Sequence, residues 1–356
     1  MDLFAVCQPG LEPVTAGEIR ALGLACTPGA GGVALEGDLR TALRLNLWLR
    51  TASRVLVRLG TFRATTFAQC VHEARALPWE VALQRKVPVA IRVTCRKSKL
   101  YHSDAVAERL RAALALRAGF EPLEGREDDP GSQLFVARFD KDVCTVSADA
   151  SGALLHQRGY RLAPGPAPLR ETLAAALLLA SGWDGSVPLC DPMCGSGTLA
   201  IEGALIAAGR APGAGRSFAV QRWPRAPPLE PLPAARPVRV TIEASDLDGG
   251  AVEATRENAA RAGVEIAISR RALADLPAAA GAGLVAVNPP YGVRVGGDLP
   301  ALYRDLGSIV RARRPGWRLA LVSPDERLSR AASGSLRRLL KTENGGLPIE
   351  LQLQAP

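Results

Sequence analysis

Residues 190–198 read Cys-Asp-Pro-Met-Cys-Gly-Ser-Gly-Thr, and this stretch decides the fold. The residues just before it are apolar, Gly195 and Gly197 favour a tight turn, and a helical pattern runs from Thr198 to residue 208. A strand, a glycine-rich turn and a helix in this order are typical of an α/β sheet that binds a nucleoside-containing ligand beyond the carboxyl end of the strand. The stretch therefore predicts an α/β domain around it.

Strand and helix patterns alternate from residue 170 onward, which predicts a mostly parallel sheet covered on both faces. The expected helices are 170–181, 198–208, 250–262 and 301–313, and the expected strands are 187–190, 238–244, 264–269, 284–287 and 318–322. A proline-rich excursion at 209–237 interrupts the series. Asn344-Gly345-Gly346 predicts a hairpin turn, and hence one antiparallel strand pair at the end of the sheet.

The first 150 residues have an α+β pattern of short strands and two or three helices. Expected strands include 3–7, 54–59, 87–94, 133–138 and 142–148, and expected helices are 10–22, 39–49 and 104–117. The segment 163–168 alternates proline with small residues, which cannot continue a helix or a strand. It predicts a boundary between two parts of the chain.

The chain of 356 residues carries 44 Lys and Arg against 35 Asp and Glu, a formal net charge of +9 that is shared by both halves. This balance favours a polyanionic partner. Seven scattered cysteines without a CxxC pair and three isolated histidines give no disulfide or metal pattern, so we expect no metal. No stretch has the length of a membrane span or a signal peptide, so we expect no membrane partner and a cytoplasmic location.

Two acids end strands in the predicted sheet. Asp191 precedes the glycine-rich turn, and Asp246 follows the next strand, where a carboxylate can accept hydrogen bonds from both ribose hydroxyls of an adenosine. Asp248 is the expected N-cap of the following helix and is therefore the poorer candidate. The free N–H groups where the helix begins at Thr198 suit the carboxylate of a methionine moiety.

Residues 288–291, Asn-Pro-Pro-Tyr, follow an apolar strand. The Asn288 side-chain oxygen and the Pro289 carbonyl can accept the two hydrogens of a planar amino group, and Pro290 fixes the backbone. Tyr291 can stack on a base that is turned out of its helix or loop. Together with the upstream glycine-rich turn, the tetrapeptide predicts methyl transfer from S-adenosylmethionine to an exocyclic nitrogen.

A basic and aromatic stretch connects a predicted strand to the following helix. It contains Arg92, Arg96, Lys97, Lys99 and Tyr101, which could contact RNA phosphates and bases. A solvated loop explains the same residues equally well.

Several motifs resemble those of the bacterial THUMP-containing large-subunit rRNA guanine-N2 methyltransferases, the RlmL-like family, which is close to tRNA guanine-N2 methyltransferases. In the second half they are residues 193–198, 201–207 and 211–213, together with 156–161, 169–174, 288–294 and 344–347. In the first half, 4–5 with 9–12 is similar to the ferredoxin-like segment of that family, and 97–103 to its THUMP core.

The resemblance implies a class I methyltransferase domain, Rossmann-like with a mostly parallel seven-stranded sheet, preceded by an α+β ferredoxin-like and THUMP RNA-binding region. The implied domains are 1–50 (ferredoxin-like), 51–155 (THUMP), 156–169 (linker) and 170–356 (methyltransferase). The implied cofactor is S-adenosylmethionine, and the implied partner is RNA.

The resemblance and the spacing together give three sets of candidate residues. The catalytic set is Asn288, Pro289, Pro290 and Tyr291. The cofactor set is Asp191, Pro192, Cys194, Gly195, Ser196, Gly197, Thr198, Asp246, Leu247, Asp275 and Asn288. The RNA-binding set is Arg92, Arg96, Lys97, Lys99, Tyr101 and Arg294.

One feature departs from the family. The family usually carries an acid after the third strand that meets the adenine amino group, whereas this chain has Arg270, Arg271 and Ala272, with Asp275 the nearest acid. The departure leaves open a catalytically silent RNA-binding assembly factor. The favoured interpretation is a guanine-N2 methyltransferase of 23S rRNA; the alternatives are tRNA as the substrate, a DNA adenine-N6 enzyme or a protein glutamine methyltransferase. The modified guanine, the number of methyl groups and the oligomeric state are not determined by the sequence.

Overall fold

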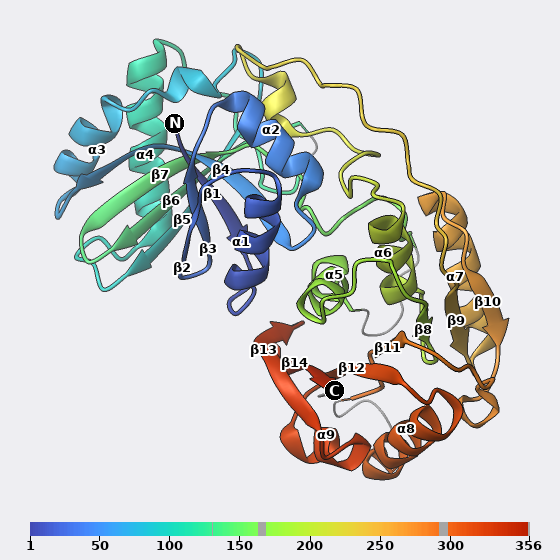
Figure 1. Ribbon diagram of the computed structural model, residues 1–356. Helices are drawn as coiled ribbons and strands as arrows, with labels where there is room; N and C mark the ends of the chain where they lie inside the picture. Colours follow the sequence, from blue (N-terminus) through green and yellow to red (C-terminus); the bar gives the residue numbers. More distant parts are fainter. Residues whose placement is uncertain (130, 163–168, 292–297, 355–356) are drawn as a thin grey trace.

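The computed structural model describes residues 1–129, 131–162, 169–291 and 298–354. The chain forms two lobes, each built on one seven-stranded sheet (Figure 1). The elements of the first lobe are β1 (Asp2–Cys7), α1 (Glu12–Ala21), β2 (Thr27–Gly29), β3 (Gly32–Glu36), α2 (Leu39–Trp48), β4 (Ala52–Arg63), α3 (Phe67–Arg75), η1 (Trp79–Val81), β5 (Val89–Arg96), α4 (Ser103–Ala118), β6 (Gln133–Asp140) and β7 (Val143–Asp149).

The first sheet has the strand order β2-β3-β1-β4-β7-β6-β5. Its neighbouring strands are antiparallel except for β5 and β6, which are parallel. Alternate strand residues such as Leu3, Ala5 and Val57 are buried in one core together with apolar residues of α1–α4. The α+β class expected for this half is confirmed. Since side chains alternate between the two faces of a strand, one face of the first sheet packs against helices α1–α4.

The second lobe contains the remaining elements. They are α5 (Glu171–Ala180), β8 (Leu189–Asp191), α6 (Thr198–Ala207), η2 (Ala219–Arg222), β9 (Ile242–Asp246), α7 (Gly249–Ala262), β10 (Ala267–Arg270), η3 (Leu273–Asp275), β11 (Gly283–Val287), α8 (Leu299–Arg313), β12 (Trp317–Ser323), α9 (Glu326–Ala332), β13 (Leu336–Asn344) and β14 (Leu347–Gln354).

The second sheet has the order β10-β9-β8-β11-β12-β14-β13, and β14 is antiparallel to both of its neighbours. The other neighbouring pairs are parallel, as expected. Both faces are covered: Leu284 and Ala286 of β11 lie in a core with α5 and α6, whereas Val285 and Val287 lie in a second core with α8 and α9. The predicted class I sheet is confirmed. A ligand site in such a sheet lies beyond the carboxyl ends of its parallel strands.

The excursion between α6 and β9 belongs in part to the first lobe. Phe218, Val220 and Trp223 are buried in the first core, and Trp223 Nε1 donates a hydrogen bond to Gln133 Oε1 on β6 at 2.7 Å. In return, Cys7 and Leu11 of the first lobe are buried in the core that contains α5 and α6. Each lobe therefore contributes residues to the core of the other. The predicted domain boundaries at 50, 155 and 169 stay predictions.

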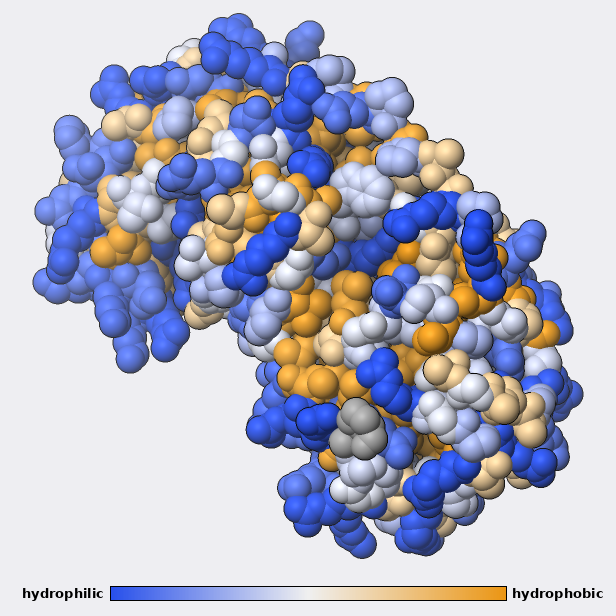
Figure 2. Space-filling model, in the orientation of Figure 1, coloured by the Kyte–Doolittle hydropathy of each residue, from blue (hydrophilic) through white to orange (hydrophobic). Residues whose placement is uncertain are grey.

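The surface in Figure 2 is hollowed between the lobes, and hydrophobic residues gather there, in the region where α5 and β13 lie in Figure 1. The outer surface of the first lobe is mostly hydrophilic in this view. Within the part of the chain that the structure describes, no helix combines the length and the apolar character needed to cross a membrane.

Candidate functional site

The glycine-rich turn connects β8 to α6. Gly195 and Gly197 have φ values of +53° and +82°, in the left-handed region that favours glycine. A Cβ atom at Gly197 would lie 2.6 Å from Thr255 Cγ2, so this position has no room for a side chain. Thr198 begins α6, as expected, so the first N–H groups of that helix directly follow the turn.

Helix α7 holds the turn in place from behind. Thr255 Oγ1 donates a hydrogen bond to the Gly195 carbonyl at 2.8 Å, and Asn258 Nδ2 donates one to the Ser196 carbonyl at 3.0 Å. Both side chains are fully buried. Our sequence interpretation missed both residues, although Thr and Asn three positions apart on the otherwise apolar stripe of an amphipathic helix are a signal that could have identified them.

Asp246 ends β9 beside the turn. One carboxylate oxygen accepts a hydrogen bond from Gly195 N at 2.9 Å, and the other accepts one from Asp248 N at 3.0 Å. Asp248 caps α7 by accepting a hydrogen bond from Gly250 N, as expected. Two hydrogen bonds therefore fix the carboxylate of Asp246 at the cavity described below. The carboxylate of Asp248 is engaged in capping α7.

Asp191 is almost completely buried at the end of β8, with 1% of its surface exposed. Among the described residues, its one hydrogen-bond donor is Met193 N at 3.3 Å. Burial raises the pKa of its carboxyl to about 8; the Met193 hydrogen bond opposes this rise, and the negative charge of Asp246 adds to it. A buried acid with few partners that lines a cavity is well placed to meet a cationic group.

The tetrapeptide 288–291 directly follows β11, whose residues are all buried. Asn288 Oδ1 is buried and accepts no hydrogen bond from any residue that the structure describes. Tyr291 is half-buried, and its hydroxyl accepts a hydrogen bond from Asn344 Nδ2 at 2.9 Å, at the end of β13. Burial raises the pKa of Tyr291, so the phenol stays neutral at physiological pH.

These groups line one cavity of about 480 Å³ at the carboxyl ends of β8, β9 and β11. Nine members of the predicted cofactor set line it: Asp191, Pro192, Cys194, Gly195, Ser196, Thr198, Asp246, Leu247 and Asn288. The predicted catalytic residues Pro289, Pro290 and Tyr291 line it as well. Further lining residues, which belong to neither predicted set, are Leu169, Met193, Leu199, Arg271, Ala272, Leu273 and Leu302.

Two predicted cofactor residues are not part of the described lining. Gly197 lies behind the turn, against Thr255, and contributes through close packing. Asp275 is exposed at the end of the short helix η3, while Arg271, Ala272 and Leu273 occupy the edge of the cavity. The structure therefore does not place Asp275 in the cavity lining, and a contact between Asp275 and the cofactor stays a prediction.

Five of the six predicted RNA-binding residues lie in the first lobe, and none of these five lines the cavity. Arg92 and Arg96 are exposed on β5, and Lys97, Lys99 and Tyr101 are exposed on the connection to α4. Arg92 forms an ion pair with Glu127 at 2.6 Å. Arg294 lies outside the described residues.

The fold and site together define a class I methyltransferase domain. Its parallel strands end at an aspartate and glycine turn, a second acid and an Asn-Pro-Pro-Tyr tetrapeptide, and an antiparallel hairpin closes one side of the sheet. The chain belongs to the family described as "RMKL-like, methyltransferase domain", whose profile matches residues 158–352. A second profile, "RlmL ferredoxin-like domain", matches residues 2–56.

Known proteins resemble the chain over nearly its whole length. The "Ribosomal RNA large subunit methyltransferase K/L" of Syntrophotalea carbinolica is 37% identical over 99% of this chain. This chain spans about half of that protein, 53% of its length. The "Putative RNA methyltransferase YpsC" of Bacillus subtilis is 31% identical, over 96% of this chain and 93% of YpsC.

A solved structure has the same fold. It is described as "SMU.472, a putative methyltransferase complexed with SAH" and superposes with a TM-score of 0.86 at 29% sequence identity. The alignment covers 99% of this chain and 97% of that one. The likeness therefore extends over both lobes.

Proposed function

We propose that this protein transfers a methyl group from S-adenosylmethionine to the exocyclic N2 of a guanine in RNA, with 23S rRNA as the substrate. The observation that carries the proposal is the single cavity that joins Asp191 and Asp246 to the tetrapeptide at Asn288. One end of this cavity offers carboxylates and the first backbone N–H groups of α6. The other end offers the buried amide oxygen of Asn288, which has no hydrogen-bond partner among the residues that the structure describes.

The chain's own residues fit the cofactor. S-adenosylmethionine supplies a methyl group on a sulfonium, ready for displacement. Asp246 is positioned to accept hydrogen bonds from the ribose hydroxyls, since its carboxylate is already fixed by Gly195 and Asp248. The N-terminus of α6 suits the methionine carboxylate, and the buried Asp191 suits a positively charged amino group.

The tetrapeptide fits an aromatic amine. The lone pair of a guanine amino group is delocalised into the ring, so the nitrogen is a poor nucleophile until its geometry is constrained. Asn288 Oδ1 and the Pro289 carbonyl can accept its two hydrogens and orient the lone pair, while the side chain of Tyr291 can stack on the base. No strong general base is needed, because the proton becomes acidic once the methyl group is attached.

The relatives favour RNA as the substrate class and S-adenosylmethionine as the cofactor. One is named as a large-subunit rRNA methyltransferase and the other as a putative RNA methyltransferase. The related structure is a complex with SAH, the product that remains when S-adenosylmethionine loses its methyl group. The net charge of +9 is compatible with a nucleic-acid substrate.

A specific observation favours one rival, a catalytically silent RNA-binding factor. The edge of the cavity formed by Arg271, Ala272 and Leu273 offers no carboxylate for an adenine amino group. If the adenine of S-adenosylmethionine does not bind at this edge, the protein would bind RNA but no cofactor, and it would transfer no methyl group.

The test uses purified protein and S-adenosylmethionine carrying an isotopically labelled methyl group. Ribosomal RNA and transfer RNA from a strain lacking the protein, genomic DNA and a protein extract are incubated separately, and label in each polymer is counted. Asn288→Ala is the matched variant, because it removes the amide oxygen but leaves Asp191 and Asp246 intact. Calorimetry measures cofactor binding by both proteins.

We expect label in ribosomal RNA from the parent protein, with a loss of at least about a hundredfold in Asn288→Ala at unchanged cofactor affinity. Label mainly in transfer RNA would overturn the choice of substrate. Label in DNA or in protein would overturn the assignment to RNA. No cofactor binding by the parent protein, together with intact RNA binding, would favour the silent factor.

A further inference from the structure

Two motifs from opposite ends of the chain meet in the structure. One is the turn 8–12 that follows β1, which we call the contact turn, and the other is the end of β13. Gln8 Nε2 donates a hydrogen bond to the Glu343 carbonyl at 2.9 Å. Gly10 has a φ of +92°, and a Cβ atom there would overlap the Lys341 carbonyl oxygen. The first lobe therefore touches the backbone of β13 directly at two positions.

The contact turn is held in shape by the first lobe. The carboxylate of Glu12 accepts hydrogen bonds from Gly10 N at 2.7 Å and from Gly31 N at 3.0 Å. Leu11 N donates a hydrogen bond to the Gln8 carbonyl at 3.0 Å, and the side chain of Leu11 is fully buried. The shape of the contact turn therefore does not depend on its contact with β13.

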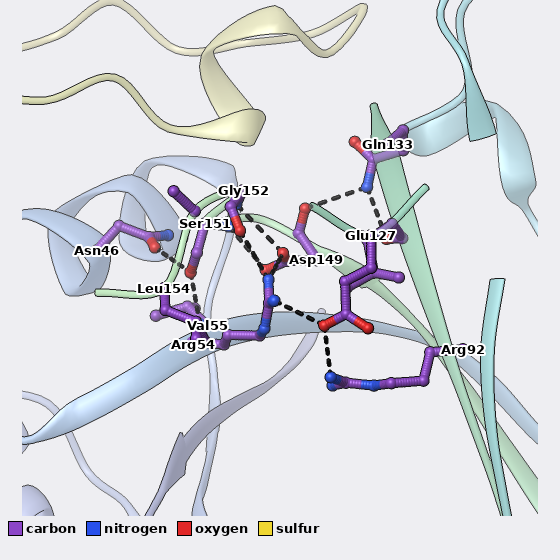
Figure 3. A network of polar contacts seen from close by, with 12 residues as sticks. Asn46, Arg54, Val55, Arg92, Glu127, Gln133, Asp149, Ser151, Gly152 and Leu154 are labelled. Atoms are coloured by element: carbon purple, nitrogen blue, oxygen red, sulfur yellow. Dashed lines mark hydrogen bonds and ion pairs between the residues drawn. The ribbon is translucent and has the colours of Figure 1, made fainter. Parts of the chain in front are cut away.

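The strand that leads into the contact turn is fixed within the first sheet. β1 pairs with β3 on one side and with β4 on the other, and Val6 lies opposite Arg54 of β4. Arg54 is buried and forms ion pairs with Asp149 and Glu127 (Figure 3). The position of the contact turn therefore depends on the position of the whole first lobe.

The end of β13 carries the residue that holds Tyr291. Asn344 directly follows Glu343, is buried, and donates a hydrogen bond from Nδ2 to the Tyr291 hydroxyl at 2.9 Å. Gly345 and Gly346 come next, with φ values of +59° and +83° that suit a two-residue hairpin turn. The hairpin of β13 and β14 thus sets the backbone position of Asn344, one residue beyond the hydrogen bond to the first lobe.

Apolar packing joins the same parts of the molecule. The core that contains α5 and α6 includes Cys7 and Leu11 of the first lobe together with Ile349 of β14. The side chain of Tyr291 packs against this core. A displacement of the first lobe relative to the hairpin would therefore reach Tyr291 through its ring as well as through its hydroxyl.

The orientation of the Tyr291 ring is the one feature of the tetrapeptide that its own backbone does not fix. Pro289 and Pro290 restrict the backbone before it, whereas a tyrosine side chain still has two rotatable bonds. Stacking on a base requires one orientation of the ring. A hydrogen bond at the far end of the phenol restricts both rotations, and Asn344 supplies it.

We propose that Asn344 positions the ring of Tyr291 for stacking on the target base, and that the contact turn keeps Asn344 in place. Asn344 is a positioning residue, because it is not among the residues that line the described cavity and acts through Tyr291. The first lobe thereby contributes to the geometry of the catalytic site. The proposal rests on the proposed function, since it takes stacking on a base as the task of Tyr291.

The test compares kcat, KM for RNA, cofactor affinity and melting temperature among variants of the full chain. Asn344→Ala removes the hydrogen-bond donor, and Tyr291→Phe removes the acceptor but keeps the ring. Gly10→Ala forces the contact turn away from β13. Gly23→Ala is its matched control, because Gly23 has a φ of +76° and a Cβ atom there would meet no described atom within 4 Å.

We expect Asn344→Ala and Tyr291→Phe each to lower kcat at least about fivefold, with KM for RNA and cofactor affinity unchanged. Because both variants remove the same hydrogen bond, the double variant should be no slower than either single variant. A kcat equal to that of the parent in Asn344→Ala, or losses that multiply in the double variant, would overturn the proposal.

The part played by the first lobe is tested in two backgrounds. Gly10→Ala should lower kcat in the parent but not in Asn344→Ala, whereas Gly23→Ala should keep the kcat of the parent. If Gly10→Ala does not fold, Gln8→Ala gives the same comparison with a loss of about twofold, because it removes only one hydrogen bond. Equal losses in both backgrounds, or no loss in the parent, would overturn the role of the contact turn.

Fluorine NMR of protein labelled with 3-fluorotyrosine provides a readout that does not depend on activity. The chain contains four tyrosines, so the signal of Tyr291 is the one that disappears in Tyr291→Phe. We expect this signal to shift in Asn344→Ala and in Gly10→Ala but not in Gly23→Ala. An unmoved signal in the first two variants would contradict the hold of Asn344 on the ring.

The outcomes for Asn344 and for the reaction are separable. A parent protein that transfers no methyl group, but whose Tyr291 signal shifts in Asn344→Ala and Gly10→Ala, refutes the proposed function and supports the contacts that hold the ring. Variants that all methylate guanine at the rate of the parent refute this proposal and leave the proposed function standing.

Discussion

Asp191 combines near-complete burial with a place in the cavity lining. The folded protein raises the pKa of its carboxyl from 3.8 to about 8, mainly through burial. Between these two values the folded state binds a proton that the unfolded state does not bind. The free energy of unfolding contributed by this group therefore decreases as the pH rises from about 4 to about 8.

Asp191→Asn removes this titration, because the amide stays neutral. We expect the ligand-free variant to lose less melting temperature than the parent between pH 5 and pH 8, and to bind S-adenosylmethionine more weakly at pH 8. Thermal unfolding at a series of pH values, with calorimetry at pH 8, measures both effects. An unchanged pH dependence would contradict the assigned titration, and unchanged affinity would contradict the assigned contact.

The sequence predicted which residues share the cavity where a residue's place depends on the chain just before it, whereas the roles of these residues stay predictions. Asp191, Asp246 and Asn288 each follow a recognisable strand, and parallel strands bring their carboxyl ends to one edge. Leu302 reaches the cavity only through the path of α8, for which the local sequence carries no signal. Asp275 was predicted from its distance along the chain alone, which does not show that it is exposed at the end of η3 and outside the cavity lining.

At the scale of elements, the turn between β8 and α6 depends on α7. Thr255 and Asn258 bind two of its carbonyls, and Thr255 also occupies the space that a Cβ atom at Gly197 would need. The two glycines of the turn differ in this respect: a Cβ atom at Gly195 would meet no atom within 4 Å in the described structure.

This difference predicts unequal effects for two alanine substitutions. Gly195→Ala should cost about 1–2 kcal/mol through its left-handed backbone alone, whereas Gly197→Ala adds a clash with Thr255 and should destabilise the protein more. The displaced turn in Gly197→Ala should also weaken cofactor binding more strongly. Melting temperatures and calorimetric affinities of both variants test this, and equal losses of stability would contradict the role of α7.

Helices with clear ends were the elements best predicted. The helix expected over 104–117 is α4, and Gly119 follows it with φ of +70°, as expected for a C-terminal glycine. Our sequence interpretation missed helix α3. Thr66 and Gln69 have the spacing of an N-terminal cap, but the helix has nine residues, too few for its apolar residues to form a clear helical period. Helix α9 has seven residues, too few to produce a periodic pattern.

At the scale of the molecule, a buried charged cluster joins the lobes. Arg158 Nη2 donates a hydrogen bond to the Arg50 carbonyl after α2, and Arg158 Nε lies 3.5 Å from Glu202 on α6. Glu202 is fully buried and also accepts a hydrogen bond from the Tyr160 hydroxyl at 3.1 Å. Since α6 begins at the glycine-rich turn, this cluster connects the first lobe to the helix that follows the turn.

Replacing only Arg158 of this cluster should lower the free energy of unfolding far more than replacing both Arg158 and Glu202. Arg158→Met removes the cation nearest to the buried Glu202 and leaves only the more distant Arg50 to oppose its charge, so the variant should be destabilised by roughly 3–5 kcal/mol. Adding Glu202→Leu should recover a large part of that loss, although the carbonyl acceptors of Arg158 stay unpaired. Chemical unfolding of the two single variants and the double variant measures the coupling. Additive losses would contradict the pairing.

The sequence predicted that the chain has two parts, but it did not predict that residues of each part are buried in the core of the other. The prolines at 163–168 mark a boundary, and the alternating pattern after it identifies the second sheet. The excursion at 209–237 has no periodicity, so nothing in its sequence indicated that Phe218 and Trp223 would be buried in the first core. Long-range packing of this kind depends on the assembled surfaces of both lobes.

The central claim is that the tetrapeptide at Asn288 holds a guanine amino group for methylation. The most direct measurement is the identity of the methylated nucleoside. Purified protein and labelled S-adenosylmethionine are incubated with 23S rRNA from a strain lacking the protein, and the RNA is digested for mass spectrometry. We predict that the label is in N2-methylguanosine. Label in N6-methyladenosine, in a ring carbon or in a ribose would contradict the claim.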